Sequence, residues 1–194
     1  MKKILIKISI ILFFTSFNLK AEIIPIKEGN FNAKVKLIIF ESLTCSHCAD
    51  FHKNIYPSLK TDFIDKGLIS IEYRNFPLDM AAFNASKIAH CNNDGNSEIL
   101  HYLYENQSEW VRGNTIEDIN KNLKILVDEY DSLLGVSFDK CLKDSKLEDH
   151  ILQDRIDASK GYKIEATPTL IINGEKFENA KNYKKLKKYI EKLI

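Results

Sequence analysis

The chain has 194 residues, of which 44% are hydrophobic and 28% are charged. This composition is ordinary for a folded protein with one substantial core, and it argues against long disordered tracts. The formal net charge is +1, whereas a nucleic-acid binder would need a strongly basic surface. The sequence contains no internal repeat and no low-complexity segment.

Residues 1–21 have the layout of a secretory signal peptide. Lys2 and Lys3 precede an apolar run from Ile8 to Phe17, and cleavage is expected after Ala21. The run is short for a membrane span, so a retained anchor is the less favoured interpretation. The leader holds four lysines and no acid, which leaves 24 basic and 27 acidic residues and a net charge of −3. In an oxidising compartment, four cysteines favour disulfide chemistry over metal binding.

Strand and helix signals then follow in an order that predicts an α/β fold. The β-branched run from Val35 to Phe40 predicts a strand buried on both faces, and it leads directly into a pair of cysteines. Helical spacing from Phe51 to Phe63 and a second strand from Leu68 to Tyr73 complete a β-α-β unit. Helices are expected over residues 81–90, 97–111, 115–130, 137–143 and 146–160, with Asn96, Asn114 and Ser137 as N-caps and Gly161 at the last helix end.

The strand pattern resumes late in the chain. Residues 169–173 and 175–178 predict two strands joined by a turn at Gly174, and a basic helix begins at Lys181. We interpret the apolar stripe of that helix as a face that packs on the sheet, rather than as a membrane or nucleic-acid contact. The stripe consists of Tyr183, Leu186, Ile190 and Leu193. The sequence therefore predicts a sheet interrupted by a helical insertion.

Cys45 and Cys48 lie two residues apart at the start of the helix that follows the first strand. Unpaired backbone N–H groups and the positive end of the helix dipole would stabilise a thiolate at Cys45, and His47 would add a positive charge or a donor. Cys48 lies further into the helix, where burial would keep its thiol protonated. Thiol–disulfide exchange requires such an asymmetry, because one sulfur attacks or is attacked and the other completes the exchange.

Two other interpretations compete for this cysteine pair. A zinc site would need a second close pair of ligands, and Cys91 and Cys141 are isolated from each other, which leaves His52 and His90 as the remaining candidates. A purely structural disulfide within the CxxC segment is the other alternative. The spacing and the expected export favour redox chemistry over both.

A second motif is ATPT at residues 166–169, which leads into the late strand. A proline there removes a strand hydrogen-bond donor, and X–Pro bonds tolerate the cis form. CxxC at a helix start, a helical insertion and a Thr-Pro before a strand together resemble the DsbA-type thiol oxidoreductases of the thioredoxin-fold superfamily. The resemblance extends over nearly the whole mature chain, including EYRNFPLD at 72–79 and TPTLIING at 167–174.

The resemblance implies a role for several residues. Cys45 would be the attacking cysteine and Cys48 the resolving one, with His47 between them. Pro168 would be the family's cis-proline, with a plain trans turn proline as the alternative. The backbone of Thr167 would pair with an extended substrate peptide.

The sequence departs from the family pattern at two places near the cysteines. The residue after Cys45 is Ser46, where the family's oxidases commonly have proline. Many relatives have a buried glutamate six residues before the first cysteine, and this chain has Ile39 there. Glu41 shares the strand face of Ile39, so it either replaces that acid as a proton relay or is a surface acid near the loop.

The resemblance also implies a second disulfide, between Cys91 and Cys141 in the helical domain. A bridge that closes a loop of roughly fifty residues stabilises a protein by about 4 kcal/mol in the chain-entropy model. We expect this pair to be structural, with a regulatory role as the alternative.

The expected organisation is a signal peptide at 1–21, a thioredoxin-like domain at 22–78 and 162–194, and an inserted helical domain at 79–161. The expected activity is that of a periplasmic thiol oxidase, a monomer without cofactor or metal that donates its disulfide to exported proteins with free cysteines. A membrane quinone-linked partner of the DsbB type would re-oxidise it. The competing functions are a disulfide isomerase or reductase, for which Thr167 is also typical, and a redox-inert binding module with this fold.

Overall fold

The computed structural model describes residues 22–130 and 137–194, so the expected signal peptide lies outside the described residues. Within those ranges no helix is both long and apolar enough to cross a membrane. In chain order the elements are β1 (Lys27–Gly29), β2 (Val35–Glu41), α1 (Ser46–Asn54), α2 (Tyr56–Leu59), the π-helical turn η1 (Lys60–Ile64), β3 (Ile69–Asn75), α3 (Met80–Ala89), α4 (Glu98–Glu105), α5 (Gln107–Trp110), α6 (Ile116–Glu129), α7 (Phe138–Lys143), α8 (Ser145–Gly161), β4 (Thr169–Ile172), β5 (Glu175–Phe177) and α9 (Tyr183–Glu191).

The strands form one sheet in the order β1-β3-β2-β4-β5. The central strands β2 and β3 are parallel and pair from Val35 with Ile69 to Glu41 with Asn75. Strand β4 is antiparallel to β2, and β5 is antiparallel to β4. Helices α3 to α8 come between β3 and β4 in the chain, so the predicted fold class is confirmed. The domain boundaries at 78/79 and 161/162 stay a prediction.

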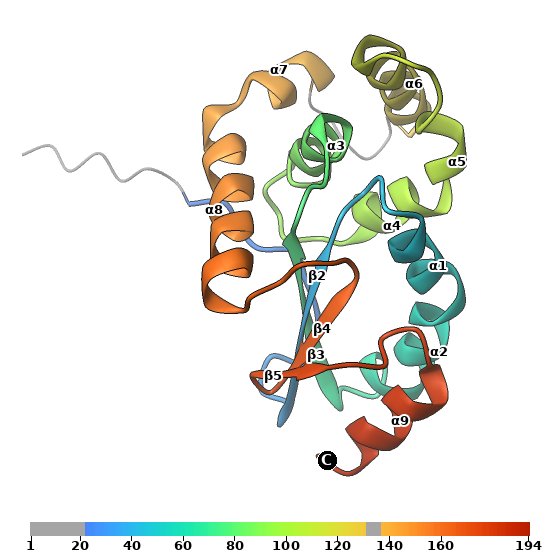
Figure 1. Cartoon of the computed structure of the whole chain (residues 1–194), viewed down its shortest axis with the longest axis vertical. Helices are drawn as coiled ribbons and strands as arrows, with labels where there is room; N and C mark the ends of the chain where they lie inside the picture. Colours follow the sequence, from blue (N-terminus) through green and yellow to red (C-terminus); the bar gives the residue numbers. More distant parts are fainter. Residues whose placement is uncertain (1–21, 131–136) are drawn as a thin grey trace, which may run out of the picture.

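Helices cover both faces of the sheet (Figure 1). Helix α8 lies on one face, where Ala158 packs in a small cluster with Phe40 and Ile171. Helices α1, α2 and α9 lie on the other face, and the remaining inserted helices lie beyond the end of β2 that leads to the cysteines (Figure 1). This arrangement places the loop after β2 between the sheet and the inserted helices.

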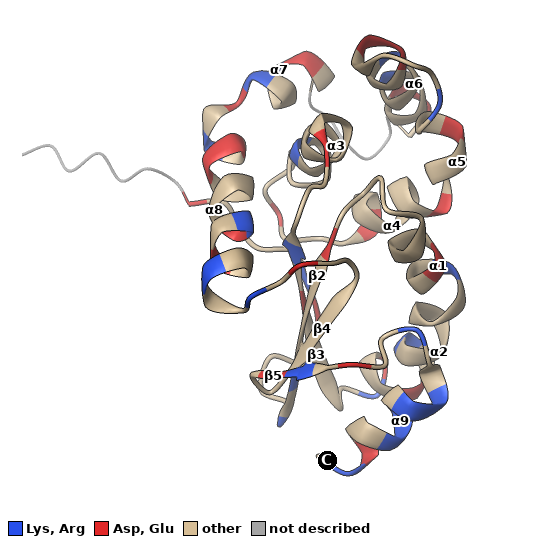
Figure 2. Ribbon diagram, in the orientation of Figure 1, with Lys and Arg blue, Asp and Glu red and all other residues tan. Residues whose placement is uncertain are grey.

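The terminal helix α9 behaves as its apolar stripe predicted. Leu186 and Ile190 are buried in the main core, whereas the lysines that colour much of α9 blue in Figure 2 include the exposed Lys184, Lys185 and Lys188. Tyr183 donates a hydrogen bond to the backbone oxygen of Ser58 at 2.9 Å, and Lys187 pairs with Asp62 at 2.8 Å. The helix is therefore a packed part of the fold.

The sequence pattern was wrong about the continuity of two helices. The segment after the cysteines divides into α1, α2 and η1 because Pro57 has no backbone N–H to continue α1. The expected helix over 97–111 divides into α4 and α5 at Asn106, whose side-chain amide donates to Tyr102 O at 2.9 Å and competes with the backbone ladder.

Several helix ends also differ from the prediction. Ser97 and Thr115 are the N-caps of α4 and α6, in place of the neighbouring Asn96 and Asn114. Asn96 still accepts a hydrogen bond from the backbone of Glu98 at 2.8 Å. Ser137 caps α7 as expected, although its side chain makes no capping bond, and α8 includes Gly161 and ends at Tyr162. Strand β1 was not predicted, since it has three residues and pairs only at the sheet edge with β3.

Candidate active site

The two cysteines of the CxxC segment lie at the junction of β2 and α1. Cys45 is the N-cap of α1 with an extended backbone (φ −77°, ψ 117°), and it is partly exposed. Cys48 is completely buried in the main core. Both are free thiols in this structure. One sulfur is therefore accessible to a substrate and the other is shielded.

The environment drives the pKa values of these thiols in opposite directions. A hydrogen bond from the Cys48 thiol lowers the pKa of Cys45 to about 5, helped by Thr167 and by the backbone N–H groups of Cys48 and His47, and opposed by partial burial. Burial raises the pKa of Cys48 far above its usual range, and the hydrogen bond to Cys45 and the charge of Glu41 raise it further. At neutral pH the pair is a thiolate and a protonated thiol.

The loop before β4 lies directly against the exposed thiol. The Thr167–Pro168 peptide bond is cis. The Cys45 sulfur lies 3.5 Å from the backbone oxygen of Thr167. Residues that are 122 positions apart in the chain therefore form one site.

His47 was expected to supply a positive charge or a hydrogen-bond donor near Cys45, and its backbone is a donor there. Its imidazole is more than half exposed, and Nδ1 lies 4.0 Å from the Asp50 carboxylate. Its backbone N–H is among the groups that lower the pKa of Cys45. The role of the exposed imidazole stays a prediction.

Two contacts from the inserted helices hold the loop at residues 42–45, and the sequence analysis missed both. The side-chain amide of Gln107 donates to Leu43 O at 2.8 Å and to Cys45 O at 3.1 Å. Thr44 donates to Asp79 at 2.8 Å, and Asp79 also caps α3. No local motif marks Gln107, because its partners are backbone carbonyls more than sixty residues away.

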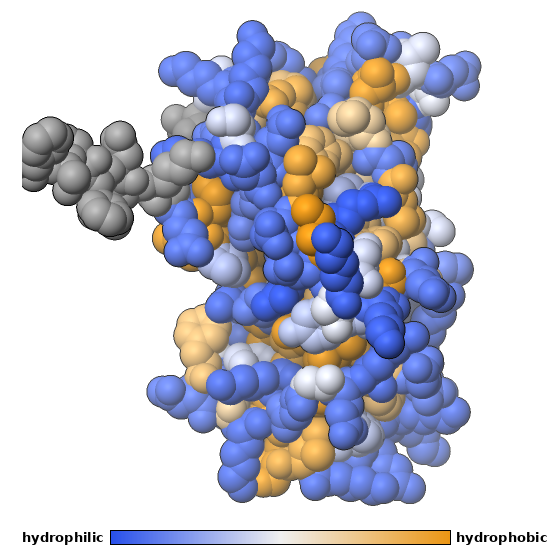
Figure 3. Space-filling model, turned by 60° about the vertical axis from the view of Figure 1, so that its left-hand side comes forward, coloured by the Kyte–Doolittle hydropathy of each residue, from blue (hydrophilic) through white to orange (hydrophobic). Residues whose placement is uncertain are grey.

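On the face that Figure 3 shows, apolar residues lie at the surface among hydrophilic ones. Leu78 and Met80 are 50% and 60% exposed. With Phe83 and Leu152 they line a groove of about 370 Å³ between the start of α3 and α8. The groove adjoins the site through Asp79, which also lines it.

Glu41 is not a surface acid, which removes one of the two interpretations of this residue. It is 5% exposed, and its Oε2 lies 2.8 Å from His52 Nε2. Ile39, at the position of the family's usual glutamate, is completely buried.

Cys91 and Cys141 are joined by a disulfide with a Cα–Cα distance of 5.6 Å. Cys91 follows the end of α3 and Cys141 lies in α7, so the bond links two segments of the helical insertion. His90 and His52, the candidate zinc ligands, lie in separate places, and His90 bonds to Asn75 at 2.9 Å. In residues 22–130 and 137–194 no group of three or more His, Cys, Asp or Glu side chains is arranged to hold a metal ion.

The fold and the site define a thioredoxin-like protein with a CxxC pair, a facing cis-proline loop and a helical insertion. A family model described as thioredoxin matches residues 24–192. The chain therefore belongs to the thioredoxin family, and its relatives place it among the DsbA-type members.

Two curated relatives show the range of similarity. A putative protein-disulfide oxidoreductase from Rickettsia bellii is 30% identical over 156 residues, which are 78% of this chain and 58% of the relative. Disulfide bond formation protein D from Bacillus subtilis is 27% identical over 175 residues, 86% of this chain and 75% of that protein. The chain thus spans little more than half the length of the Rickettsia relative.

Solved structures agree with this assignment. The crystal structure of Wolbachia pipientis alpha-DsbA1 superposes with a TM-score of 0.77 and 27% identity, covering 87% of this chain and 90% of that one. Oxidised BdbD from Bacillus subtilis gives a TM-score of 0.69 at 21% identity, covering 87% and 92%, and supports the fold alone.

Proposed function

We propose that this protein is an exported thiol oxidase that introduces disulfides into other exported proteins through the Cys45–Cys48 couple. The observation that carries the proposal is the opposite ionisation of the two thiols, with the pKa of Cys45 near 5 and that of Cys48 raised. A stabilised thiolate favours the reduced couple, so the disulfide is a strong oxidant.

The proposed reaction has two exchange steps. A substrate thiolate attacks Cys45 Sγ of the disulfide, the bond to Cys48 breaks, and the Cys48 thiolate takes up a proton. A second substrate thiolate attacks the substrate's own sulfur in the mixed disulfide, and Cys45 leaves as a thiolate. The substrate is oxidised by two electrons and the couple is reduced by two.

The surroundings of Cys45 support a polypeptide substrate. The backbone of Thr167 lies beside the reacting sulfur and would pair with an extended peptide, as the family resemblance implies. The groove lined by Leu78 and Met80 offers apolar surface next to the site, and unfolded chains expose apolar side chains. Any substrate with free cysteines in an extended segment would therefore suit the site.

The signal-like residues 1–21 support export to the periplasm. An oxidase that turns over must pass on the two electrons that it takes from each substrate. We propose that a membrane quinone-linked partner of the DsbB type accepts them. The names of the curated relatives, which refer to disulfide oxidoreduction and disulfide bond formation, support the same class of reaction.

A trapping experiment tests the roles of the two cysteines. Cys48→Ser should accumulate mixed disulfides between Cys45 and exported proteins, seen on non-reducing gels and identified by mass spectrometry. Cys45→Ser is the matched control and should trap none; equal trapping by both variants would show that the assignment of attacking and resolving cysteine is wrong.

The reduction potential separates the oxidase from its rivals. An oxidising potential, measured by equilibration with glutathione, supports the oxidase, whereas a potential near that of thioredoxin would identify a reductase. A couple that does not exchange with glutathione at all would identify a redox-inert binding module.

A further inference from the structure

A chain of hydrogen-bonded ionisable side chains leads from the cysteine site to the edge of the sheet. Glu41 Oε2 lies 2.8 Å from His52 Nε2, His52 Nδ1 lies 2.9 Å from His101 Nδ1, and His101 Nε2 lies 2.5 Å from Glu28 Oε1. Side-chain exposure rises along the chain, from 4% and 2% at Glu41 and His52 to 14% and 12% at His101 and Glu28. The four residues come from β2, α1, α4 and β1.

Aromatic rings hold the two imidazoles in place. His52 stacks on Tyr104 with ring centroids 4.0 Å apart, and His101 stacks on Tyr56 at the same distance. The Tyr56 hydroxyl also donates to Glu28 at 2.8 Å. Glu41 and His52 are buried and His101 and Glu28 are partly buried, which is costly for ionisable groups unless they are paired, so a set this well paired calls for a function.

We propose that Glu41, His52, His101 and Glu28 form a proton path between Cys48 and solvent. The inference rests on the proposed thiol chemistry, in which buried Cys48 must gain a proton when it leaves the disulfide and lose one when it attacks a mixed disulfide. Cys48 is completely buried, so bulk water cannot serve it directly.

The hydrogen bonds allow a proton to cross without any ring rotation. Each of the three contacts needs one hydrogen, and since the imidazoles meet Nδ1 to Nδ1, one ring donates and the other accepts. When the hydrogen in each of these three hydrogen bonds moves from its donor to its acceptor, Glu41 loses a proton and Glu28 gains one. The hydrogens pass from Glu41 to His52, from His52 to His101 and from His101 to Glu28, and the reverse shift brings a proton inward.

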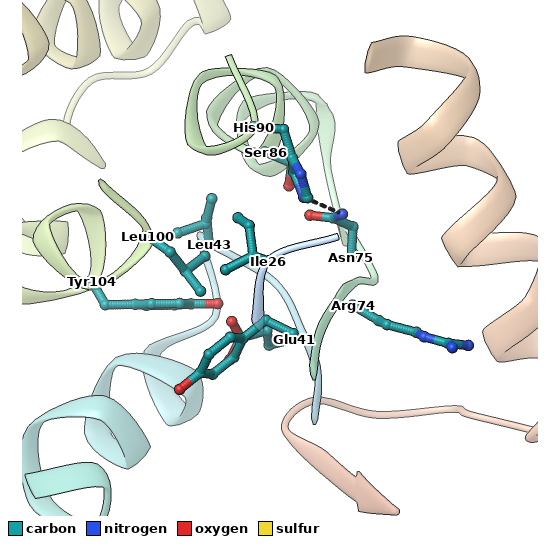
Figure 4. Close-up of a pocket in the computed structure, with 10 residues that line it drawn as sticks. Ile26, Glu41, Leu43, Arg74, Asn75, Ser86, His90, Leu100 and Tyr104 are labelled. Carbon is teal, nitrogen blue, oxygen red and sulfur yellow. Dashed lines mark hydrogen bonds between the residues drawn. The ribbon is translucent and has the colours of Figure 1, made fainter. Parts of the chain in front are cut away.

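The inner end of the path is open for exchange with Cys48. Glu41 Oε1 is buried and has no hydrogen-bond partner among the described residues. Glu41 and the Tyr104 hydroxyl line one small cavity, where Figure 4 shows them pointing toward each other. Burial raises the pKa of Tyr104, and the charges of Glu41, Cys48 and Cys45 raise it further, so Tyr104 interacts with the carboxylate and with both thiols.

The outer end is suited to release. Burial alone would raise the pKa of Glu28, but the hydrogen bond and charge of His101, with hydrogen bonds from Ser97 and Tyr56, lower it to about 2. Glu28 is therefore ionised at neutral pH while His101 donates to it, and its side chain is more exposed than that of Glu41 (12% against 4%), so proton exchange with water takes place at this end. The other ionisable groups that face the path are Tyr73 on β3, which donates to Glu28 at 3.2 Å, and Asp65 and Glu105, whose charges act on Tyr56.

The test follows the step in which Cys48 must lose its proton. Cys45 is first converted to a mixed disulfide with glutathione, and the release of glutathione by Cys48 is then timed near neutral pH. His101→Ala should slow this release by about 10- to 100-fold, the lower part of the range for assisted proton transfer. Added imidazole should restore the rate in His101→Ala, because His101 is partly exposed and the small ring can enter the space that the deleted side chain leaves. 1-Methylimidazole should not restore it, because its methylated nitrogen cannot pass a proton to the second neighbour.

Three further variants separate proton transfer from packing. His101→Phe keeps the ring against Tyr56 and should be as slow as His101→Ala, and Glu28→Gln should also be slow. His150→Ala is the matched control, a histidine 3.9 Å from the carboxylate of Asp154 and outside the path, and it should release glutathione at the wild-type rate.

The possible results are distinct. Wild-type rates in folded His101→Phe and Glu28→Gln, or a slow His101→Ala that imidazole does not rescue, would overturn the path. A wild-type protein that releases no glutathione would instead refute the proposed thiol chemistry. Alkylation of Cys45 by iodoacetamide should proceed equally in all variants, which confirms that only the step at Cys48 has changed.

Discussion

Selective reduction of the Cys45–Cys48 disulfide should change the stability of the protein in a direction that depends on pH. An ordinary disulfide that closes a ring of four residues stabilises a protein by about 2 kcal/mol in the chain-entropy model. Reduction removes this contribution but allows Cys45 to ionise in the folded state. The net effect is the difference between the two.

The size of the ionisation effect follows from the pKa of Cys45, which falls from 9.0 to about 5 on folding. The resulting stability is present in full above pH 9.0, declines as the pH falls, and is lost near pH 5. At pH 7 it is about 2.7 kcal/mol from the linkage relation, and about 2 after a discount for solvent screening at this partly exposed site. The raised pKa keeps Cys48 protonated in the folded protein, and its ionisation in the unfolded state, where the pKa is 9.0, offsets only about 0.4 kcal/mol by pH 9.

The two effects therefore cancel close to neutral pH. The oxidised form should be more stable by about 2 kcal/mol at pH 5, and the reduced form by about as much at pH 9. Urea unfolding of both forms across this range, with Cys91–Cys141 kept oxidised, measures the difference. An oxidised form that stays more stable at every pH would refute a lowered pKa of Cys45, and with it the argument for a strong oxidant.

Three other perturbations have expected outcomes. Replacing Cys91 and Cys141 by serine should reduce the free energy of unfolding by about 4 kcal/mol, since the bond spans 50 residues, while dithiol oxidation continues; loss of oxidation in a folded variant would make the pair regulatory. Gln107→Ala should cost about 1–2 kcal/mol and slow alkylation of Cys45, because two hydrogen bonds to the loop disappear. Stability that depends on Glu28 should be lost as the pH falls from 4.5 toward 2, and Glu28→Gln should flatten this part of an acid-unfolding curve.

The sequence was sufficient to predict the fold because the spacing of apolar residues and the residues at turns and helix ends indicate the same elements. The apolar run at 35–40 and the helical periods at 81–160 fall on observed elements. The errors occur where a single residue overrides the period, as Pro57 and Asn106 do. Strand β1 could not be found, since three residues give too little pattern and the pairing with β3 is decided by tertiary contact.

The sequence could predict only those features of the site that depend on residues close together in the chain. CxxC at a helix start indicates two unlike thiols from sequence alone, and the sequence could place Glu41 on a strand face. It could not show that the carboxylate bonds to His52, or that His101 and Glu28 continue the contact from elements far along the chain. Side-chain contacts of this kind follow from the packing of α1 against α4, which no short motif encodes.

Glu41 has two effects on Cys48 that at first conflict, because its charge raises the pKa of the thiol from which it would accept a proton. The conflict disappears when the state of Cys45 is considered. While Cys45 is a thiolate, the hydrogen bond it accepts from Cys48 holds the Cys48 proton in place, and Glu41 reinforces this. Once Cys45 is part of a mixed disulfide, it carries no charge and that hydrogen bond loses its strength. Burial still raises the pKa of Cys48, so in the proposed path its proton passes to Glu41 as Cys48 attacks the mixed disulfide, and the buried thiolate does not accumulate.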